Sequence, residues 1–297
     1  MVARPYTGPR MLPAIIRLIR PRQWVKNAFV VAPLFFTPEA MTRSGIAAVA
    51  IAVAAFCCIA SAVYVINDWA DREADRQHPT KRTRPLAAGT VSLPAAGATI
   101  AVLLVLAVGL ASLLPRGFAY VAGTYFVLNV AYSQFLKHVS LLDVMIISVG
   151  FVLRIMAGSA AIGVDTTVWI IVCAFLLALF MALAKRRDDL VKAMDSTHRA
   201  SLKGYNLAFI DQSLTMVMGA LLVSYLIYTT DTSVIAKFGT NKLYLTAPFV
   251  AAGVLRYLQI TLVEEGSGSP TDVVLTDKFL IATVAGWVAT FAVLIYG

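Results

Sequence analysis

The sequence predicts an all-α, polytopic membrane protein with nine transmembrane helices. Hydrophobic residues make up 59% of the 297 residues and charged residues only 14%, whereas soluble domains have about 25% charged residues. Apolar runs long enough to cross a hydrocarbon core of about 30 Å recur along the chain, and Lys and Arg gather in alternate loops. These observations exclude a soluble globular protein.

The nine predicted spans follow one another without a linker or an internal repeat. The sequence therefore predicts a single integral membrane domain over 1–297, with a cytoplasmic or interfacial amino-terminal segment over 1–25. The first span is interrupted by Pro33 and Pro38. The spans cover 26–41, 45–66, 93–114, 118–136, 140–162, 167–184, 212–230, 243–263 and 279–296.

The placement of Lys and Arg predicts the orientation. On one side the loops carry only Arg43, Arg116, Lys237 and Lys242, whereas the amino terminus and the opposite loops carry most of the 25 Lys and Arg residues. Because cytoplasmic loops are enriched in these residues, we expect the amino terminus to be cytoplasmic in a bacterial plasma (inner) membrane. The net charge of +9 reflects this bias and attraction to membrane phospholipids, so it does not indicate a nucleic-acid partner.

Carboxylates cluster where the second span ends. Residues 67–75 read Asn-Asp-Trp-Ala-Asp-Arg-Glu-Ala-Asp, directly after a long uncharged run. If the helix continues, Asp68, Asp71 and Asp75 lie within an arc of about 60° on one face. Such carboxylates repel one another unless cations bind them, and hard oxygen ligands suit Mg²⁺ together with substrate phosphate. We predict a Mg²⁺-diphosphate site here; a solvated helix end at the headgroups is the alternative.

Cations lie on both sides of this acidic stretch. Lys26 stands at the start of the first span, where only snorkelling or a bound anion would make its charge favourable. Four more cations follow the acidic stretch, Lys81, Arg82, Arg84 and Lys137, and Tyr132 lies shortly before the last of them. Opposite charges on either side of a short loop suit a phosphate ester with its metal. The alternative is an ordinary cluster of positive charge on the cytoplasmic side.

Three ionisable residues fall inside predicted spans. Asp143 and Arg154 belong to the fifth span, about three turns apart and near one face, and Arg256 belongs to the eighth. Charged side chains inside a membrane are costly and mark candidate functional sites, so all three are candidates for substrate binding. A purely structural pair between Asp143 and Arg154 is the alternative.

A second charged cluster ends the sixth span. Lys185, Arg186 and Arg187 lead it, two aspartates follow, and Tyr205 lies farther on. The predicted topology places this cluster and the acidic stretch on the same side of the membrane. The two could therefore converge on one cavity.

Together these features resemble the UbiA superfamily of intramembrane prenyltransferases. The resemblance rests on Asn67-Asp68-x-x-Asp71-x-x-x-Asp75 after the second of nine helices, on the stretches 81–85 and 132–137, and on the charged loop after the sixth helix. It covers nearly the whole chain. It implies a UbiA-like bundle in which two charged motifs face one another, Mg²⁺ activates a diphosphate, and a lateral opening admits a polyprenyl chain.

The second motif departs from the usual family pattern. Family members carry a second D-x-x-x-D there, whereas three cations lead this cluster, and Asp189 and Asp195 are six residues apart. With Arg-Pro-Arg-Gln-Trp-Val-Lys-Asn at 20–27, the sequence resembles the decaprenyl-phosphate phosphoribosyltransferase branch. That resemblance implies Mg²⁺-dependent transfer of 5-phosphoribose from phosphoribosyl diphosphate (PRPP) to decaprenyl phosphate for cell-wall arabinan synthesis.

The excess of cations is consistent with this branch. A phosphoribosyltransferase must bind a 5-phosphate and a lipid phosphate besides the diphosphate, and both call for Lys and Arg. We expect Asp68, Asp71 and Asp75 to hold Mg²⁺ on the diphosphate, with Asn67 orienting it. The expected substrate-binding residues are Lys26, Lys81, Arg82, Arg84, Tyr132, Lys137, Asp143, Arg154, Lys185, Arg186, Arg187, Tyr205 and Arg256.

Other functions fit parts of the sequence. A UbiA-type prenyltransferase acting on an aromatic or quinone precursor is disfavoured by the cationic second cluster. An anion or phosphate-ester transporter would place its charges along a pathway, but most acidic residues cluster at one surface. A CDP-alcohol phosphotransferase is disfavoured because the sequence lacks D-G-x-x-A-R. The oligomeric state, a homo-oligomer included, is left open.

Overall fold

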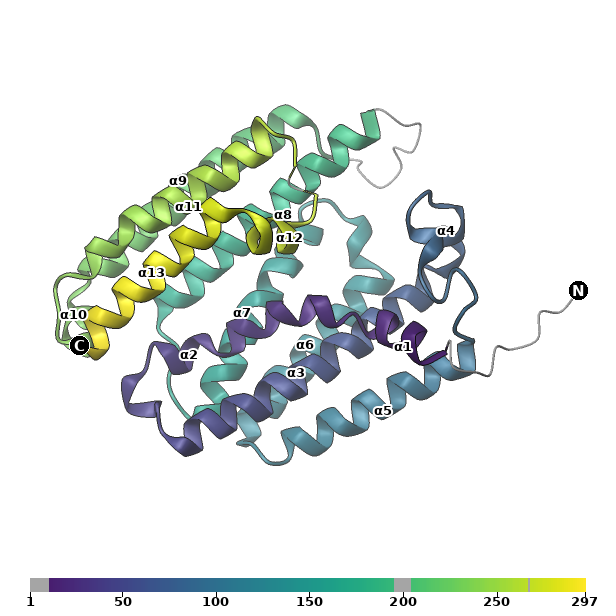
Figure 1. Cartoon of the computed structure of the whole chain (residues 1–297), viewed down its shortest axis with the longest axis horizontal. Helices are drawn as coiled ribbons and strands as arrows, with labels where there is room; N and C mark the ends of the chain where they lie inside the picture. The colour runs from purple at the N-terminus through teal and green to yellow at the C-terminus, as the bar shows by residue number, and fades with distance from the viewer. Residues whose placement is uncertain (1–10, 195–203, 267) are drawn as a thin grey trace, which may run out of the picture. The chain divides into compact units, whose positions relative to one another are not determined.

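The computed structural model of the chain describes residues 11–194, 204–266 and 268–297, and every regular element in them is a helix (Figure 1). The helices group into two compact units, Met1–Lys137 with Leu153–Asp165, and His138–Val152 with Thr166–Gly297. The single membrane domain expected from the sequence stays a prediction. Residues 1–10 of the expected amino-terminal segment lie outside the described residues.

Seven of the described helices are long and apolar enough to cross a membrane, so the chain is a multi-pass membrane protein. They are α3 (Arg43–Ala70), α5 (Leu93–Ala111), α7 (Leu142–Ile162), α8 (Val168–Met194), α9 (Leu207–Thr230), α11 (Ala247–Leu262) with the preceding η6 (Leu243–Thr246), and α13 (Lys278–Tyr296).

The first and fourth predicted spans differ from the rest. The segment 26–41 is not one helix, because the 3₁₀ helix η1 (Pro21–Val30) gives way to the short α2 (Ala32–Phe35) and η2 (Pro38–Ala40). Prolines stand at the starts of α2 and η2, where a missing N–H is tolerated. The fourth is α6 (Arg116–Gln134), long enough to span but rich in polar and tyrosine residues. The count of nine spans stays a prediction.

In the first unit, α3 packs against α1 (Met11–Ile19), η1, α5 and α6, as Figure 1 shows for α3, α5 and α6. The fully buried Phe56 ring of α3 lies 5.9 Å from the Phe118 ring and 5.1 Å from the Tyr125 ring, both on α6. The carboxyl-terminal part of α7 also belongs to this unit. There Gly158 lies so close to η1 that a Cβ would sit 2.1 Å from the Val30 carbonyl oxygen.

In the second unit, α8, α9, α11 and α13 lie side by side (Figure 1). Their core contains Leu214 and Leu221 of α9 and the Phe180 ring of α8, which lies 5.6 Å from the Tyr257 ring of α11. The short helices α10 (Thr232–Phe238) and α12 (Pro270–Thr276) connect the long ones. These helices position the second charged cluster at the carboxyl-terminal end of α8.

Candidate functional site

The acidic stretch lies where α3 passes into the short helix α4 (Arg72–Gln77). The prediction of an unbroken helix is wrong at Asp71, whose backbone (φ −87°, ψ 0°) forms a one-residue turn. The path stays nearly helical, because the Asp71 N–H donates to the Asn67 carbonyl at 2.9 Å and the Asp75 N–H to the Asp71 carbonyl at 2.8 Å. Asp68 and Asp75 therefore face the same side, as their spacing predicts.

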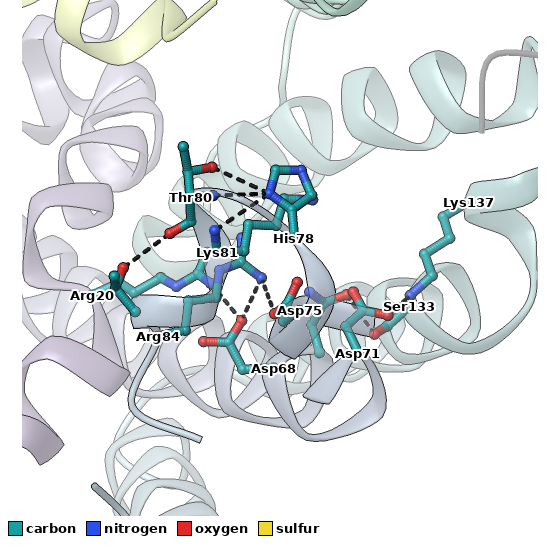
Figure 2. A network of polar contacts seen from close by, with 12 residues as sticks. Arg20, Asp68, Asp71, Asp75, His78, Thr80, Lys81, Arg84, Ser133 and Lys137 are labelled. Atoms are coloured by element: carbon teal, nitrogen blue, oxygen red, sulfur yellow. Dashed lines mark hydrogen bonds and ion pairs between the residues drawn. The ribbon is translucent and has the colours of Figure 1, made fainter. Parts of the chain in front are cut away.

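Asp68 and Asp75 share one guanidinium group (Figure 2). The Arg84 Nη1 atom lies 3.0 Å from Asp68 Oδ1 and 2.8 Å from Asp75 Oδ2. Asp68 also pairs with Arg20, at 2.5 Å between Nη2 and Oδ1. The two carboxylates are only 2% and 3% exposed, and buried charges are tolerated when they are paired and hydrogen-bonded. Arginines, and not carboxylate spacing alone, make this acidic face stable.

The other two residues of the motif turn toward the end of α6. Lys137 on η4 (Leu136–His138) pairs with Asp71. Ser133 Oγ donates to Asn67 Oδ1 at 2.8 Å (Figure 2). Arg20 and Ser133 are not among the residues expected from the sequence. The signal for Arg20 was its place in the 20–27 stretch, and Ser133 was marked only by its position next to Tyr132.

No group of three His, Cys, Asp or Glu side chains among the described residues is arranged to hold a metal ion. Two carboxylates nevertheless surround one cationic nitrogen, Arg84 Nη1, within 3.0 Å. Hard oxygen donors around a cation suit Mg²⁺. The chemistry of Asp68 and Asp75 thus fits a divalent ion if Arg84 moves aside, whereas Asp71 is held by Lys137.

The other predicted substrate-binding residues near this motif do not form ion pairs with its carboxylates among the residues that the structure describes. Lys81 and Arg82 lie on η3 (Lys81–Thr83), are exposed, and make no ion pair with any residue that the structure describes. Tyr132 is half-buried on α6. Of the basic stretch 81–85, only Arg84 reaches the carboxylates.

The second cluster contains a network around buried Asp143 of α7, all within the second unit. Arg186 Nε lies 2.6 Å from Asp143 Oδ2, and its Nη1 lies 3.0 Å from Asp189 Oδ2. The Tyr205 hydroxyl donates to Asp143 Oδ1 at 2.5 Å and accepts from the Leu141 N–H at 2.7 Å. Burial and the bond to Asp143 raise the pKa of Tyr205, which keeps its proton for this contact.

Arg187 joins three helices of the second unit. Its Nε lies 2.8 Å from Asp211 Oδ1 of α9, and its Nη1 donates to the Thr261 carbonyl of α11 at 2.9 Å. Arg187 is only 8% exposed, whereas Lys185 is exposed. Carboxylates thus match both arginines of this cluster; Asp195 lies outside the described residues. The expected convergence of the two clusters on one cavity stays a prediction.

The ionisable residues within spans also find partners. Arg154 donates to Asn27 and Tyr125 in the first unit, and the suggested structural pair of Arg154 with Asp143 stays a prediction. Arg256 is half-buried rather than buried, and pairs with Asp277 at 2.8 Å and Glu264 at 2.6 Å. The Arg256 hydrogen bond lowers the pKa of Asp277. Arg256 thereby ties α11 to the start of α13.

Known proteins resemble the chain over most of its length. Residues 28–283 match the model of the UbiA prenyltransferase family. The chain is 36% identical over 289 residues to the decaprenyl-phosphate phosphoribosyltransferase of Corynebacterium glutamicum, covering 95% of this chain and 86% of that protein. It is 32% identical over 317 residues to the protein of the same name from Mycolicibacterium smegmatis, covering 99% and 96%.

Solved structures share the fold at low sequence identity. A UbiA homolog from Archaeoglobus fulgidus bound to DMAPP and Mg²⁺ superposes with a TM-score of 0.70 at 21% identity, covering 95% of this chain and 99% of that chain. A structure of a UbiA homolog from the same organism bound to Cd²⁺ gives a TM-score of 0.67 at 20% identity, covering 96% and 100%.

Proposed function

The chain belongs to the UbiA prenyltransferase family, and from this premise we propose that it transfers 5-phosphoribose from PRPP to decaprenyl phosphate. The products are diphosphate and decaprenylphosphoryl-5-phosphoribose, a precursor for cell-wall arabinan. The arrangement that carries the proposal is the Asp68–Arg84–Asp75 cluster, which brings together carboxylates for a metal ion and a cation for phosphate oxygens. Relatives named decaprenyl-phosphate phosphoribosyltransferase give the substrate class.

Mg²⁺ is the metal that we assign to this site, because UbiA homologs are solved with Mg²⁺ and because Asp68 and Asp75 already surround a cation. Asp68 and Asp75 would hold it, and Asp71 would join them if Lys137 releases it. When bound, Mg²⁺ supplies positive charge that stabilises the departing diphosphate.

The protein's own cations bind and orient the diphosphate. Arg20, Arg84 and Lys137 are each held against a motif carboxylate, so their charge-assisted donors are already gathered where phosphate oxygens would bind. Ser133 occupies the Asn67 Oδ1 atom, which leaves the Asn67 Nδ2 group to donate to the ligand. These contacts are in place before the substrate arrives, which favours preorganised electrostatic stabilisation.

The reaction breaks the bond between ribose C1 and the diphosphate oxygen, and the bonding electrons leave with the diphosphate. Positive charge develops at C1. A lipid phosphate oxygen forms the new C1–O bond from the opposite face, so an α donor gives a β-linked product. The lipid phosphate is already anionic near neutral pH, and no general base is assigned.

The orientation follows from the distribution of cations. The amino terminus and the acidic stretch are proposed to face the cytoplasm of a bacterial plasma membrane, because most Lys and Arg lie in the loops of that side. There PRPP, a soluble donor, can reach the site from the water phase, while the polyprenyl chain of the acceptor stays in the bilayer.

A product assay tests the proposal. Purified protein in detergent with Mg²⁺ is offered radiolabelled PRPP with a polyprenyl phosphate, and in parallel a polyprenyl diphosphate with aromatic acceptors. A labelled lipid in the first mixture, abolished by a chelator, is the expected result. Product in the second mixture alone would overturn the proposal and favour an ordinary aromatic prenyltransferase.

A further inference from the structure

The connection between α6 and α7 has an ion pair at each of its ends. At one end, Lys137 of η4 pairs with Asp71 of the acidic stretch (Figure 2). At the other end, Asp143 at the start of α7 accepts from the Arg186 Nε atom of the second charged cluster at 2.6 Å. The backbone path from 137 to 143 therefore determines where one charged partner of each cluster lies.

The backbone of this connection is strained at Leu141. Its φ of 70° lies in the left-handed region, where the Cβ atom of an L-residue comes too close to the following carbonyl oxygen. Leu141 is 49% exposed, so burial of its side chain offsets little of this cost. A sparsely populated backbone conformation persists only where the surrounding structure holds it. Contacts to the Leu141 backbone must therefore stabilise this conformation.

Tyr205 supplies such a contact. Its hydroxyl accepts from the Leu141 N–H at 2.7 Å and donates to Asp143 Oδ1 at 2.5 Å. One hydroxyl thus satisfies both the strained residue and the carboxylate two residues later. Because Tyr205 occupies Oδ1, the other carboxylate oxygen of Asp143, Oδ2, is presented to Arg186.

The residue before Tyr205 approaches the same connection closely. Gly204 has a φ of 97°, and a Cβ atom at this position would lie 2.5 Å from Ser140 Oγ and 2.9 Å from Ser140 Cβ. Glycine is therefore required here both for its backbone conformation and for the space that it leaves. Two segments far apart in the sequence thus meet at Ser140, Leu141 and Asp143. Three contacts within four residues fix the path of the connection more firmly than one hydrogen bond would.

We propose that Tyr205 is a positioning residue, which holds Leu141 in the left-handed conformation and thereby keeps Lys137 at the acidic stretch. The inference rests on the proposed function, in which Lys137 supplies positive charge to the diphosphate. It differs from the expectation drawn from the sequence, because the Tyr205 hydroxyl acts through the backbone and does not touch the substrate. A group misplaced by about 1 Å can cost about 100-fold in rate, so a fixed path for the connection matters to the reaction.

Substitutions at Leu141 separate positioning from substrate contact. Tyr205→Phe removes the hydroxyl and should lower kcat/KM for phosphoribosyl transfer about 10- to 100-fold. Glycine adopts the left-handed conformation without steric cost, so Leu141→Gly added to Tyr205→Phe should recover about fivefold or more of this loss. Leu141→Ala is the matched control, because it shortens the same side chain but keeps the Cβ atom, and it should recover no activity.

Each kinetic outcome decides for or against the positioning role. If the Tyr205 hydroxyl touched the substrate, no change at Leu141 would replace it, and Leu141→Gly would recover no more activity than Leu141→Ala. That result would overturn the inference. Activity of Tyr205→Phe within about twofold of the wild type would overturn it as well, since the loss of a positioning contact must lower kcat/KM.

Chemical labelling of Lys137 tests the same inference without turnover. The full-length protein in detergent is treated with a trace of an acetylating reagent, and mass spectrometry gives the acetylation of Lys137 relative to the exposed Lys242. The Lys137 side chain is 17% exposed and paired with Asp71, so it should react slowly in the wild type. We expect Tyr205→Phe to raise its acetylation about threefold or more, because the connection opens locally more often. Leu141→Gly should reverse most of this increase, and Leu141→Ala should not.

A second variant disturbs the contact while the hydroxyl stays in place. Gly204→Ala puts a Cβ atom against Ser140 and should raise the acetylation of Lys137 as Tyr205→Phe does. Phe209→Leu, whose native ring lies 6.2 Å from the Tyr205 ring, is the control and should not. Unchanged labelling of Lys137 in both Tyr205→Phe and Gly204→Ala would overturn the inference. If the wild type forms no phosphoribosyl lipid but the labelling changes as expected, the proposed function fails and the positioning role stands.

Discussion

The role of Arg84 as a stand-in for a metal ion can be tested by removing it. Arg84→Met leaves Asp68 with Arg20 as its partner but takes from Asp75 the cation that neutralises it. Both carboxylates are almost fully buried. Breaking a buried ion pair by removing one partner costs about 3 to 5 kcal/mol, and the lower value is expected here because Asp68 keeps Arg20.

The magnitude can be measured by thermal unfolding of the purified protein in detergent with a chelator, where we expect the variant to melt several degrees lower. Mg²⁺ should then raise the melting temperature of Arg84→Met more than that of the wild type, because the ion no longer competes with a guanidinium for the same carboxylates. Arg82→Met, on the neighbouring exposed side chain, is the matched control and should leave stability unchanged. A Mg²⁺ response no larger than that of the wild type would refute the reasoning.

Three further predictions concern activity and packing. Asp68→Asn should leave a folded protein whose phosphoribosyl transfer is at least about 100-fold slower at every Mg²⁺ concentration, since each 1.4 kcal/mol of lost stabilisation is tenfold in rate; near-normal turnover would contradict the metal assignment. Tyr205→Phe removes the hydroxyl that joins Asp143 to the Leu141 N–H and should cost about 1 to 3 kcal/mol in unfolding experiments, whereas Phe209→Leu on the neighbouring exposed ring should cost less. Gly158→Ala places a methyl group 2.1 Å from the Val30 carbonyl oxygen and should destabilise the protein by at least about 1 to 3 kcal/mol, while Gly123→Ala, which meets nothing within 4 Å, should not.

Local spacing predicted the parts of the site that depend on one helix. The i, i+7 relation of Asp68 and Asp75 requires only helical geometry, and both carboxylates do face one guanidinium. The same geometry did not predict the position of Asp71, because α3 ends at Ala70, one residue before it. The long apolar runs were equally predictable, since seven of the nine expected spans are helices that can cross a membrane.

Contacts between distant segments could not be predicted in this way. Arg20 lies 48 residues before Asp68, and although the 20–27 stretch drew attention to it, local spacing does not show that it pairs with Asp68. Arg186 was expected to bind phosphate because cations lead its cluster, but Asp143 lies 43 residues away in sequence and neutralises it. The sequence shows which ionic groups are present, but the fold determines which of them form ion pairs.

The pairing in turn explains how such a site can exist without its substrate. Each carboxylate of the motif holds a cation that a phosphate ligand would need: Arg20 and Arg84 at Asp68, Arg84 at Asp75, and Lys137 at Asp71. If the carboxylates turn to a divalent ion and the cations to phosphate oxygens, every buried charge keeps an opposite partner throughout. Because an unpaired buried charge is far more costly than an exchanged one, a charge-balanced resting site of this kind can admit a highly anionic substrate without first exposing either set of charges.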